Sequence, residues 1–501
     1  NRYRIPSSKN IGQLMLEPFK NSVSQIAKAV NESKLKVEDV VQFYSKRVNA
    51  HKNQLNSFLY FDESQVAQEV DRVSKLIKTN KKLPLAGVPI TIKDNICTKD
   101  VPTTCASKIL EGYKPPYNAE VVDKLKNAGA LIFGKSNMDE FAMGSSTENS
   151  AYGPTKNPWD LERVPGGSSG GSAAVVAADL APGSLGSDTG GSIRQPAALC
   201  GVVGLKPSYG RVSRYGLVAY GSSLDQIGPF AKNVRDAALL LDVLSGWDER
   251  DSTSQKDSQT NTFSNLNPQR KLRVGYVKEF FTKDLNPEVN TALQEAIKVY
   301  KDAGCEIIDV SLPNIEYSVA TYYVVATAES SANLARYDGV RYGYRTPDYK
   351  NLVDLYEKSR SYGFGREVKQ RIMLGTFALS SGYYDAYYGS ALKVQQLLKQ
   401  DFAAAFKKVD LLISPTSPTT AFKIGEKSDD PLSMYLSDIY TIATNLAGIP
   451  GISVPCGFDK KGLPIGLQLM APHFCEQELL DGALMYEEKT KWHEQKRPNI
   501  R

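Results

Sequence analysis

Two clusters of glycine and serine are the parts of this sequence best suited to chemistry. They read GGSSGGS at residues 166–172 and GSDTGGSIR at residues 186–194. Glycine lets the backbone turn sharply and leaves neighbouring N–H groups unshielded by side chains. A serine in such a place can attack a carbonyl carbon, while free N–H groups stabilise the oxyanion that develops. Apolar neighbours such as Ile193, Leu199 and Val202 argue against a flexible linker. The clusters therefore predict acyl transfer by serine.

A nucleophilic serine needs a base, and the histidines of this chain do not offer one. His51, His473 and His493 all lie outside the glycine-rich segment, so we expect them at the surface or at the edge of the core. Lysine can serve as the base when burial keeps it neutral. Lys93 follows the apolar run 88–92, which predicts a strand with the lysine at its end. A lysine at a strand end is also a common surface residue, and the residues alone leave that alternative open.

A third motif, GALIFGKS at residues 129–136, matches the sequence pattern of a phosphate loop. A phosphate loop needs its variable residues exposed in a glycine-turned loop after a strand. Here residues 130–133 are apolar enough to be the strand itself, so nucleotide binding is not predicted at this motif. Instead, Ser136 or Asn137 is expected to cap a helix that begins near Met138 and Asp139.

Composition places the chain among globular proteins and excludes several classes of function. It has 501 residues, of which 41% are hydrophobic and 23% charged, with a formal net charge of +6. Such a chain builds a core without disulfides. The excess of positive charge lies in residues 1–60, whereas a nucleic-acid binder would spread it over a face with aromatic residues between. The six cysteines show neither C-x-x-C pairs nor zinc-ligand spacing, so we expect reduced thiols and no metal site.

The beginning of the chain and one uncharged stretch bear on its compartment. No apolar secretion signal stands near the first residue, and a basic leader without Met favours an organelle, plastid or mitochondrion, over a bacterial cytoplasm. Residues 439–458 carry no charge but contain prolines and glycines. They predict a helix end, a turn and a buried strand in place of a membrane span. We therefore expect a soluble intracellular protein.

Strand and helix patterns alternate along most of the chain, which predicts an α/β protein. Helical spacing of apolar residues runs through 23–30 and 40–44, and a polar connection is expected at about 247–270. The other predicted elements are helices at 119–127 and 289–300 and strands at 85–92, 130–133, 272–277, 306–310, 411–414, 451–455 and 465–469. No internal repeat or long linker divides the chain, so we expect one large core.

The two clusters, Lys93 and the run CGVVGLKP at 200–207 together resemble the amidase signature family. Ser168 precedes Ser192 by 24 residues and Lys93 precedes it by 99, which is the spacing of that family's Ser, cis-Ser and Lys triad. The resemblance implies that Ser192 is the nucleophile, Ser168 the bridging serine held by a cis peptide, and Lys93 the base. It also implies an oxyanion hole made by the backbone N–H groups of Thr189, Gly190 and Gly191.

The resemblance further implies a fold and a layout of the chain. We expect a single α/β/α domain around a large mixed β-sheet over residues 22–488, with a basic leader at 1–21 and a basic tail at 489–501. Within the family, the sequence is most similar to the A subunits of glutamyl-tRNA(Gln) amidotransferases. The motifs that carry this similarity lie at 134–144, 213–219, 223–228, 341–344 and 374–384.

Similarity to that branch implies a glutaminase. Such a protein hydrolyses glutamine to glutamate and ammonia through a serine acyl-enzyme, and a partner uses the ammonia to convert Glu-tRNA(Gln) to Gln-tRNA(Gln). The implied partners are a tRNA-binding B subunit, which is the transferase, and a small C subunit of a heterotrimer. ATP and Mg²⁺ would bind the partner, and no cofactor is expected in this chain.

Free glutamine needs a cation for its α-carboxylate and an anion for its α-ammonium group. An arginine fork matches a carboxylate in geometry. The resemblance points to Arg371 for the carboxylate, to Asp438 for the ammonium group, and to Tyr322 as a further lining residue. Without the resemblance, Arg371 would be interpreted as a solvated residue on a helix.

Two alternatives stay open at this point. The first is a stand-alone amidase that uses the same triad on other small or lipid amides and needs no partner. The second is a non-catalytic subunit that only holds the assembly together. Whether Asp-tRNA(Asn) is also amidated is not readable from this chain, because that choice would lie with the tRNA-binding partner.

Overall fold

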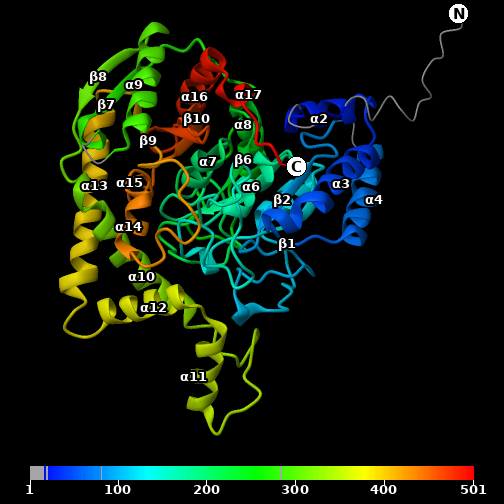
Figure 1. The fold of residues 1–501 in the computed structure, drawn as a ribbon, viewed down its shortest axis with the longest axis vertical. Coiled ribbons are helices and arrows are strands. Elements are labelled where there is room, and N and C mark those ends of the chain that lie inside the picture. Colours follow the sequence, from blue (N-terminus) through cyan, green and yellow to red (C-terminus); the bar gives the residue numbers. More distant parts are fainter. Residues whose placement is uncertain (1–15, 18–20, 80–81, 282–284, 501) are drawn as a thin grey trace, which may run out of the picture.

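Eleven strands within the described residues form one mixed sheet through the centre of the molecule (Figure 1). The computed structural model describes residues 16–17, 21–79, 82–281 and 285–500. The strands are β1 Phe58–Tyr60, β2 Pro89–Lys93, β3 Leu131–Ser136, β4 Gly183–Asp188, β5 Val203–Lys206, β6 Gln226–Ala231, β7 Arg273–Val277, β8 Glu306–Val310, β9 Leu411–Pro415, β10 Gly451–Phe458 and β11 Pro464–Met470. Their order across the sheet is β1-β3-β2-β4-β6-β5-β10-β11-β9-β7-β8.

Two parallel groups of strands stand on either side of an antiparallel centre. Strands β2, β3 and β4 run parallel, and so do β7, β8 and β9. The strands between these groups pair antiparallel, as does the short edge strand β1 with β3. The predicted large mixed β-sheet is therefore confirmed.

Helices connect and cover the strands. They are α2 Val23–Asn31, α3 Val37–Leu55, α4 Glu63–Thr79, α5 Glu120–Asn127, α6 Gly170–Ala177, α7 Arg194–Cys200, α8 Val234–Leu244, α9 Pro287–Asp302, α10 Ser318–Leu334, α11 Leu352–Gly363, α12 Arg366–Leu379, α13 Ser390–Phe406, α14 Pro431–Tyr435, α15 Ile442–Ala447, α16 Glu476–Thr490 and α17 Trp492–Gln495. Helices α6 and α7 contact each other and the central strands, whereas α16 contacts α8 and α9 in a second group against the sheet. In Figure 1, α11 and α12 lie below the sheet, away from its strands.

The two strands that carry site residues lie side by side. Strands β2 and β4 are buried along their whole length and pair in parallel, with Ile92 opposite Leu185. Strands buried on both faces are typical of the parallel part of a sheet. Because parallel strands end at the same edge, Lys93 at the end of β2 comes next to Ser187 at the end of β4. The loops that follow these strands can therefore share one site.

Most of the predicted elements are confirmed. Each predicted strand corresponds to an observed one, and the helices at 119–127 and 289–300 correspond to α5 and α9. Residues 439–458 form α15, a turn at Gly448 and β10. Among the described residues, no helix has the length and apolar character needed to cross a membrane.

The helix predicted near Met138 and Asp139 is wrong. The chain there makes only a short 3₁₀ turn, Glu140–Ala142, in which Phe141 has a φ of +50°. The Asp139 carboxylate accepts hydrogen bonds from the amides of Thr147 and Asn149, at 2.9 and 3.0 Å. These contacts hold residues 139–147 as a buried loop, and local capping signals do not outweigh them.

The structure describes most of the predicted tail and the predicted polar connection, and little of the predicted leader. The predicted leader at 1–21 lies outside the described residues except for 16, 17 and 21. The predicted tail begins inside α16, and its described part includes α17. The polar connection at 247–270 forms no helix or strand, yet Asp248 and Asp251 in it are buried.

Candidate active site

Lys93 lies at the end of β2 and is completely buried. Its Nζ is 2.8 Å from the hydroxyl of Ser168, 2.9 Å from the hydroxyl of Ser187 and 3.3 Å from the carbonyl oxygen of Ser187. The structure therefore brings together Lys93 and Ser168, which are 75 residues apart in the sequence. A lysine at a strand end can be exposed, but the amine of this one is enclosed by the oxygens of Ser168 and Ser187.

Burial makes Lys93 able to act as a base. The loss of solvation lowers the pKa of Lys93 to about 7, although the carboxylates of Asp139 and Asp188 oppose that change. A lysine with this pKa is neutral in a large fraction of molecules at neutral pH. Its lone pair is then available to take a proton from a neighbouring hydroxyl.

Ser168 lies in a tight loop before α6, and the peptide bond Gly167–Ser168 is cis. The Gly167 amide donates to the side-chain oxygen of Gln195 at 3.0 Å, and the Ser168 carbonyl oxygen accepts from the amide of Asp139. A Cβ atom at Gly167 would lie 2.2 Å from the Asp139 carboxylate, so only glycine fits there. The close approach of backbone to side chains explains why this cluster is so rich in glycine.

Ser192 lies in the turn between β4 and α7 and keeps 8% of its surface exposed, more than Lys93 or Ser168. Asp188 holds this turn, because its carboxylate accepts from the amides of Gly191 and Ile193 at 2.8 and 3.1 Å. The carbonyl oxygen of Ser192 accepts from the amide next to Ser168, that of Ser169, at 3.2 Å. The two serine clusters are thus joined through their backbones.

A fully buried ion pair between Arg194 and Asp188 anchors the turn that contains Ser192. Arg194 contacts Asp188 through Nε at 3.1 Å and Nη2 at 3.0 Å, and its Nη1 donates to the side chain of Gln468 at 2.7 Å. Burial acts to raise the pKa of Asp188, but the charge of Arg194 outweighs it and lowers that pKa to about 2. Asp188 is therefore a permanent anion beneath the serine turn.

We expect Arg194→Met to lower the free energy of unfolding by about 3 kcal/mol or more, because it leaves the Asp188 charge buried without its partner. Thermal or urea unfolding measures the change. Arg235→Met is the matched control, since Arg235 pairs with Glu488 at the exposed surface, where the loss should be below about 1 kcal/mol. Equal losses in the two variants would contradict this account of the turn.

One of the three amides predicted to form the oxyanion hole has a hydrogen-bond partner within the protein. The amide of Gly191 already donates to Asp188, so it is not free for a substrate oxygen. Within the described residues, the amides of Thr189, Gly190 and Ser192 make no hydrogen bond. The Thr189 hydroxyl donates to Asp225 at 2.6 Å, which fixes this part of the turn. The donors available to an oxyanion are therefore those of Thr189, Gly190 and Ser192.

Arg371 is buried on α12, with 3% of its surface exposed, and is not the solvated residue that its local sequence indicates. Its Nε donates to Glu367 and its Nη1 to the hydroxyl of Tyr220, both at 2.7 Å. The rings of Tyr220, Tyr323 and Tyr435 lie within 5.6 Å of the guanidinium carbon. This aromatic cage holds the planar guanidinium in a fixed orientation.

Tyr322 connects this cage to the serine turn. Its ring packs edge-on against that of Tyr323 at 5.1 Å between centroids. A Cβ atom at Gly190 would lie 2.6 Å from Cζ of Tyr322, so the tyrosine ring rests directly on the turn. The predicted lining residue is therefore placed between Arg371 and the free amides.

Asp438 lies on the other side of the turn, at the end of the 3₁₀ turn Leu436–Asp438. A Cβ atom at Gly191 would be 3.4 Å from Oδ1 of Asp438. That oxygen is buried without a hydrogen-bond partner, whereas the other accepts from the hydroxyl of Ser145. Burial raises the pKa of Asp438 to about 7. A buried carboxylate oxygen left unpaired beside the Ser192 turn is suited to receive a cationic group of a ligand.

Comparison with known proteins places this geometry in a family. The sequence profile described as Amidase matches residues 39–480. The chain belongs to the amidase family. The A subunit of the glutamyl-tRNA(Gln) amidotransferase of Caldanaerobacter subterraneus is 54% identical, over 95% of this chain and 98% of that protein. The A subunit from Nostoc sp. is 58% identical, over 88% and 91%. The crystal structure of the A subunit from Thermotoga maritima has a TM-score of 0.80 at 41% identity, over 97% of this chain and 99% of that one.

This membership confirms the resemblance and the α/β fold inferred from the sequence. Within the amidases, the chain falls among the A subunits of glutamyl-tRNA(Gln) amidotransferases, since relatives of that name share more than half of the aligned residues. The phosphate-loop match is also explained. Lys135 is buried in an amidase core, where it lies 3.3 Å from the carboxylate of Asp94 and donates to Thr103, so it does not face a ligand.

Several residues of this amidase site were not predicted. Asp188 and Arg194 stand four residues before and two after Ser192, and their opposite charges in so apolar a segment were a readable signal. Ser187, Asn95 and Tyr220 gave no such signal, because only the packing of the strands and of α12 brings them to the site. No group of three or more metal-binding side chains occurs in the part of the chain that the structure describes.

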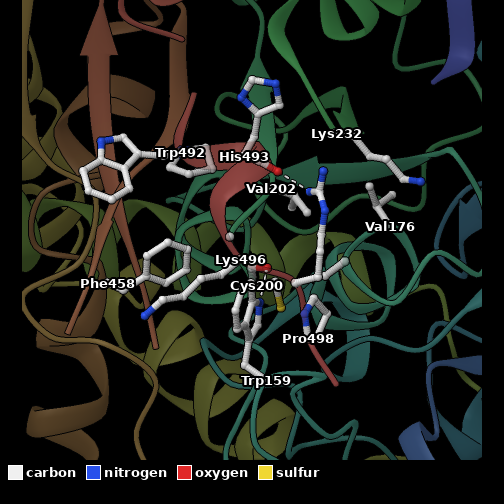
Figure 2. Close-up of a pocket in the computed structure, with 14 residues that line it drawn as sticks. Trp159, Val176, Cys200, Val202, Lys232, Phe458, Trp492, His493, Lys496 and Pro498 are labelled. Carbon is white, nitrogen blue, oxygen red and sulfur yellow. Dashed lines mark hydrogen bonds between the residues drawn. The ribbon is translucent and has the colours of Figure 1, made fainter. Parts of the chain in front are cut away.

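A small cavity lies in this amidase away from the site described above. Figure 2 shows Trp159, Phe458 and Trp492 around it, with Lys496 over the Phe458 ring at 4.7 Å from its centroid. His493 lines the same cavity and is partly buried. The volume of about 20 Å³ has room for about one water molecule. No predicted site residue lines it, so it plays no part in the chemistry considered below.

Proposed function

We propose that this chain is the glutamine-hydrolysing subunit of a tRNA-dependent amidotransferase. The observation that carries the proposal is the hydrogen bond between a buried Lys93 and Ser168 beside the turn of Ser192. Asp438 lies next to that turn, and Arg371 is linked to it through the rings of Tyr323 and Tyr322. Lys93 and Ser168 can activate the Ser192 hydroxyl. Arg371 and Asp438 match the carboxylate and the ammonium group of a free amino acid.

In the proposed reaction, the Ser192 hydroxyl oxygen attacks the γ-amide carbon of glutamine. Its proton passes to Ser168, whose own proton passes to Lys93. The negative charge on the amide oxygen is stabilised by the free amides of the turn. The C–N bond then breaks as the proton returns from Lys93 through Ser168 to the leaving ammonia. Water attacks the resulting ester by the same route, and glutamate is released.

Arg371 and Asp438 supply the specificity for glutamine. Nη2 of Arg371, whose Nε and Nη1 already donate to Glu367 and Tyr220, would donate to the α-carboxylate, and the unpaired Oδ1 of Asp438 would accept from the α-ammonium group. Tyr322 limits the space above the turn. Holding both ends of the amino acid fixes the distance from its α-carbon to the γ-amide, which places that amide at Ser192.

The ammonia would be used by a partner. The relatives carry the name of one component of glutamyl-tRNA(Gln) amidotransferase, and we extend that assembly to this chain, with a tRNA-binding B subunit, a small C subunit and Glu-tRNA(Gln) as the final acceptor. ATP and Mg²⁺ would bind to the partner subunit. Exposed apolar side chains on α12 and just after it support contact with another protein, and the large ones are Met373, Leu374, Phe377, Tyr383, Tyr384 and Tyr387.

The test is release of ammonia and glutamate from glutamine, by the chain alone and in mixtures with candidate partner subunits and Glu-tRNA(Gln). Release that rises in the complete mixture supports the coupled reaction. If no mixture consumes glutamine while a simple aryl or fatty amide is cleaved, the stand-alone amidase replaces this proposal.

The pH dependence of glutamine hydrolysis should be steep on the acid side. Lys93 must be neutral to accept a proton, and Asp438 must be ionised to hold the ammonium group. Because both pKa values are about 7, kcat/KM should fall below pH 7 by roughly a hundredfold per pH unit, as two protons are gained.

A small amide without an α-ammonium group separates the two contributions. It needs only neutral Lys93, so its kcat/KM should fall roughly tenfold per pH unit below pH 7. Stopped assays between pH 5 and 9 measure both slopes. A rate for glutamine that stays constant from pH 5 to 8 would contradict the assignment of Lys93 as the base.

A further inference from the structure

Ser187 supplies two of the three oxygen atoms around the amine of Lys93. Its hydroxyl lies 2.9 Å and its carbonyl oxygen 3.3 Å from Nζ, and the third oxygen is the hydroxyl of Ser168 at 2.8 Å. Strand β4 fixes the backbone of Ser187 by pairing with β6, opposite Ile227. The hydroxyl of Ser169 also donates to the Ser187 carbonyl oxygen at 3.0 Å.

Asn95 holds the Ser187 hydroxyl in place. Its Nδ2 donates to the Ser187 Oγ at 2.9 Å, and both residues are at most 2% exposed. An amide nitrogen can only donate, so one lone pair of the serine oxygen is occupied by Asn95. The other lone pair faces Lys93. The proposed mechanism assigns no role to either residue.

Counting protons shows what this arrangement does. A neutral amine has two N–H groups and one lone pair, and a carbonyl oxygen can only accept. If the Ser187 carbonyl and hydroxyl oxygens accept the two N–H groups, the lone pair of Lys93 points to the remaining neighbour, Ser168. After Lys93 gains a proton, its three N–H groups have three acceptors. The proton can thus move between Ser168 and Lys93 without any change in the other hydrogen bonds.

We propose that Ser187, held by Asn95, is a positioning residue that aims the lone pair of Lys93 at Ser168 and stabilises the ammonium form of Lys93 during attack by Ser192. This inference rests on the proposed function, because it needs Lys93 to be the base. It assigns to Ser187 and Asn95 a part in the proton transfer that does not involve contact with the substrate.

The charged and titratable groups that face Lys93 are Asp139, Asp188 and Asp225, with the thiol of Cys105. The three carboxylates raise the pKa of Lys93 against the effect of burial, and none of them is changed in the variants below. The acid limb is the part of the pH profile in which the rate falls toward low pH. A shift of this limb along the pH axis in those variants therefore reports on Ser187 and Asn95.

Removing the Ser187 hydroxyl should have two effects. Ser187→Ala deletes an acceptor of the charged amine, so the pKa of Lys93 falls and the acid limb of kcat/KM moves about one pH unit lower. The plateau rate should also fall, by about ten- to a hundredfold, because the charged lysine is less stable in the transition state. Ser187→Thr keeps the hydroxyl and should restore the position of the limb. A purely structural defect would lower the plateau and leave the limb in place.

Asn95→Asp should move the limb in the opposite direction. The variant places a carboxylate beside the Ser187 hydroxyl, and a negative charge near Lys93 favours its ammonium form. The acid limb should therefore move to higher pH. A pair of variants with opposite shifts is not expected from loss of packing alone.

The experiment follows two rates from pH 5 to 9 in each variant: kcat/KM for glutamine, and labelling of Ser192 by a fluorophosphonate, which needs the base but not the glutamine site. Shifts of the limb in opposite directions for Ser187→Ala and Asn95→Asp support the inference. If the wild type shows an acid limb in labelling and neither variant moves it, the inference is wrong and the proposed function stands.

Failure of the proposed function gives a different result. In that case the fluorophosphonate leaves Ser192 of the wild type unlabelled at every pH, or Ser192→Ala keeps the rate for glutamine. Thermal unfolding identifies a variant that does not fold. If Ser187→Ala is such a variant, Asn95→Asp decides, because an unmoved limb in that variant overturns the inference and a limb at higher pH supports it.

Discussion

Ser192→Ala should lower the rate of glutamine hydrolysis by about 10⁴-fold or more while the fold is preserved. The variant removes the only atom that forms a bond to the substrate in the proposed reaction, and loss of a serine nucleophile has effects of this size in other acyl-transfer sites. The turn itself should survive, because its amides and Asp188 hold it through bonds that do not involve the Ser192 hydroxyl. Coupled measurement of ammonia and glutamate determines the loss.

Ser184→Ala is the matched control for this variant. Ser184 is buried on β4, the strand that leads into the Ser192 turn, and its hydroxyl donates to the carbonyl oxygen of Ser172 at 2.9 Å, away from the proton relay. Its rate should stay within about twofold of the wild type. If Ser192→Ala keeps full release of ammonia in the assembled complex, the chain is a non-catalytic assembly subunit, and the proposed mechanism is wrong.

Arg371→Met should lower kcat/KM for glutamine by about 10²- to 10³-fold, largely through KM. The charged hydrogen bonds between a guanidinium and a carboxylate are lost, and each such bond contributes about 1.5 to 3 kcal/mol. A small neutral amide such as butyramide has no carboxylate, so its rate should change less than about threefold. Initial rates with both substrates give the comparison directly.

Lys369→Met is the control on the same helix. Lys369 is an exposed cation on α12 whose Nζ donates to the carbonyl oxygen of Ser361 at 3.1 Å. Its replacement should leave the rates with both substrates unchanged within about twofold. Equal losses of both substrates in Arg371→Met would show that the arginine supports the site structurally, and a stand-alone amidase for other amides would then be the better interpretation.

The strands of this protein were predictable because their signal is local. A buried strand is a short apolar run between turn residues, and β2, β3, β10 and β11 have that form. The order of the strands across the sheet was not predictable in this way. It depends on contacts between segments as far apart as Lys206 and Gly451, which pair across β5 and β10.

The one helix that was predicted and not found shows the limit of local signals. Ser136 and Asn137 are good capping residues in sequence, yet Asn137 donates to the backbone carbonyl oxygens of Asn56 and Gly153 at 3.0 Å each. These distant acceptors satisfy its side chain and fix the chain as a loop. A residue that can cap a helix can also tie two loops together, and the tertiary contacts decide which it does.

The sequence by itself predicted the reacting groups: a serine in a glycine-rich turn and, through the resemblance to the amidases, a second serine 24 residues earlier and a lysine at the end of an apolar strand. These three residues can be predicted from the sequence because the chemistry requires those residue types in particular local settings. Only the tertiary structure decided how they are held and what they face. Arg371 is buried by tyrosines from other segments, Gly191 is engaged by Asp188, and Ser187 stands at Lys93 because β2 and β4 are neighbours. Those facts depend on packing between distant parts of the chain, which no local pattern records.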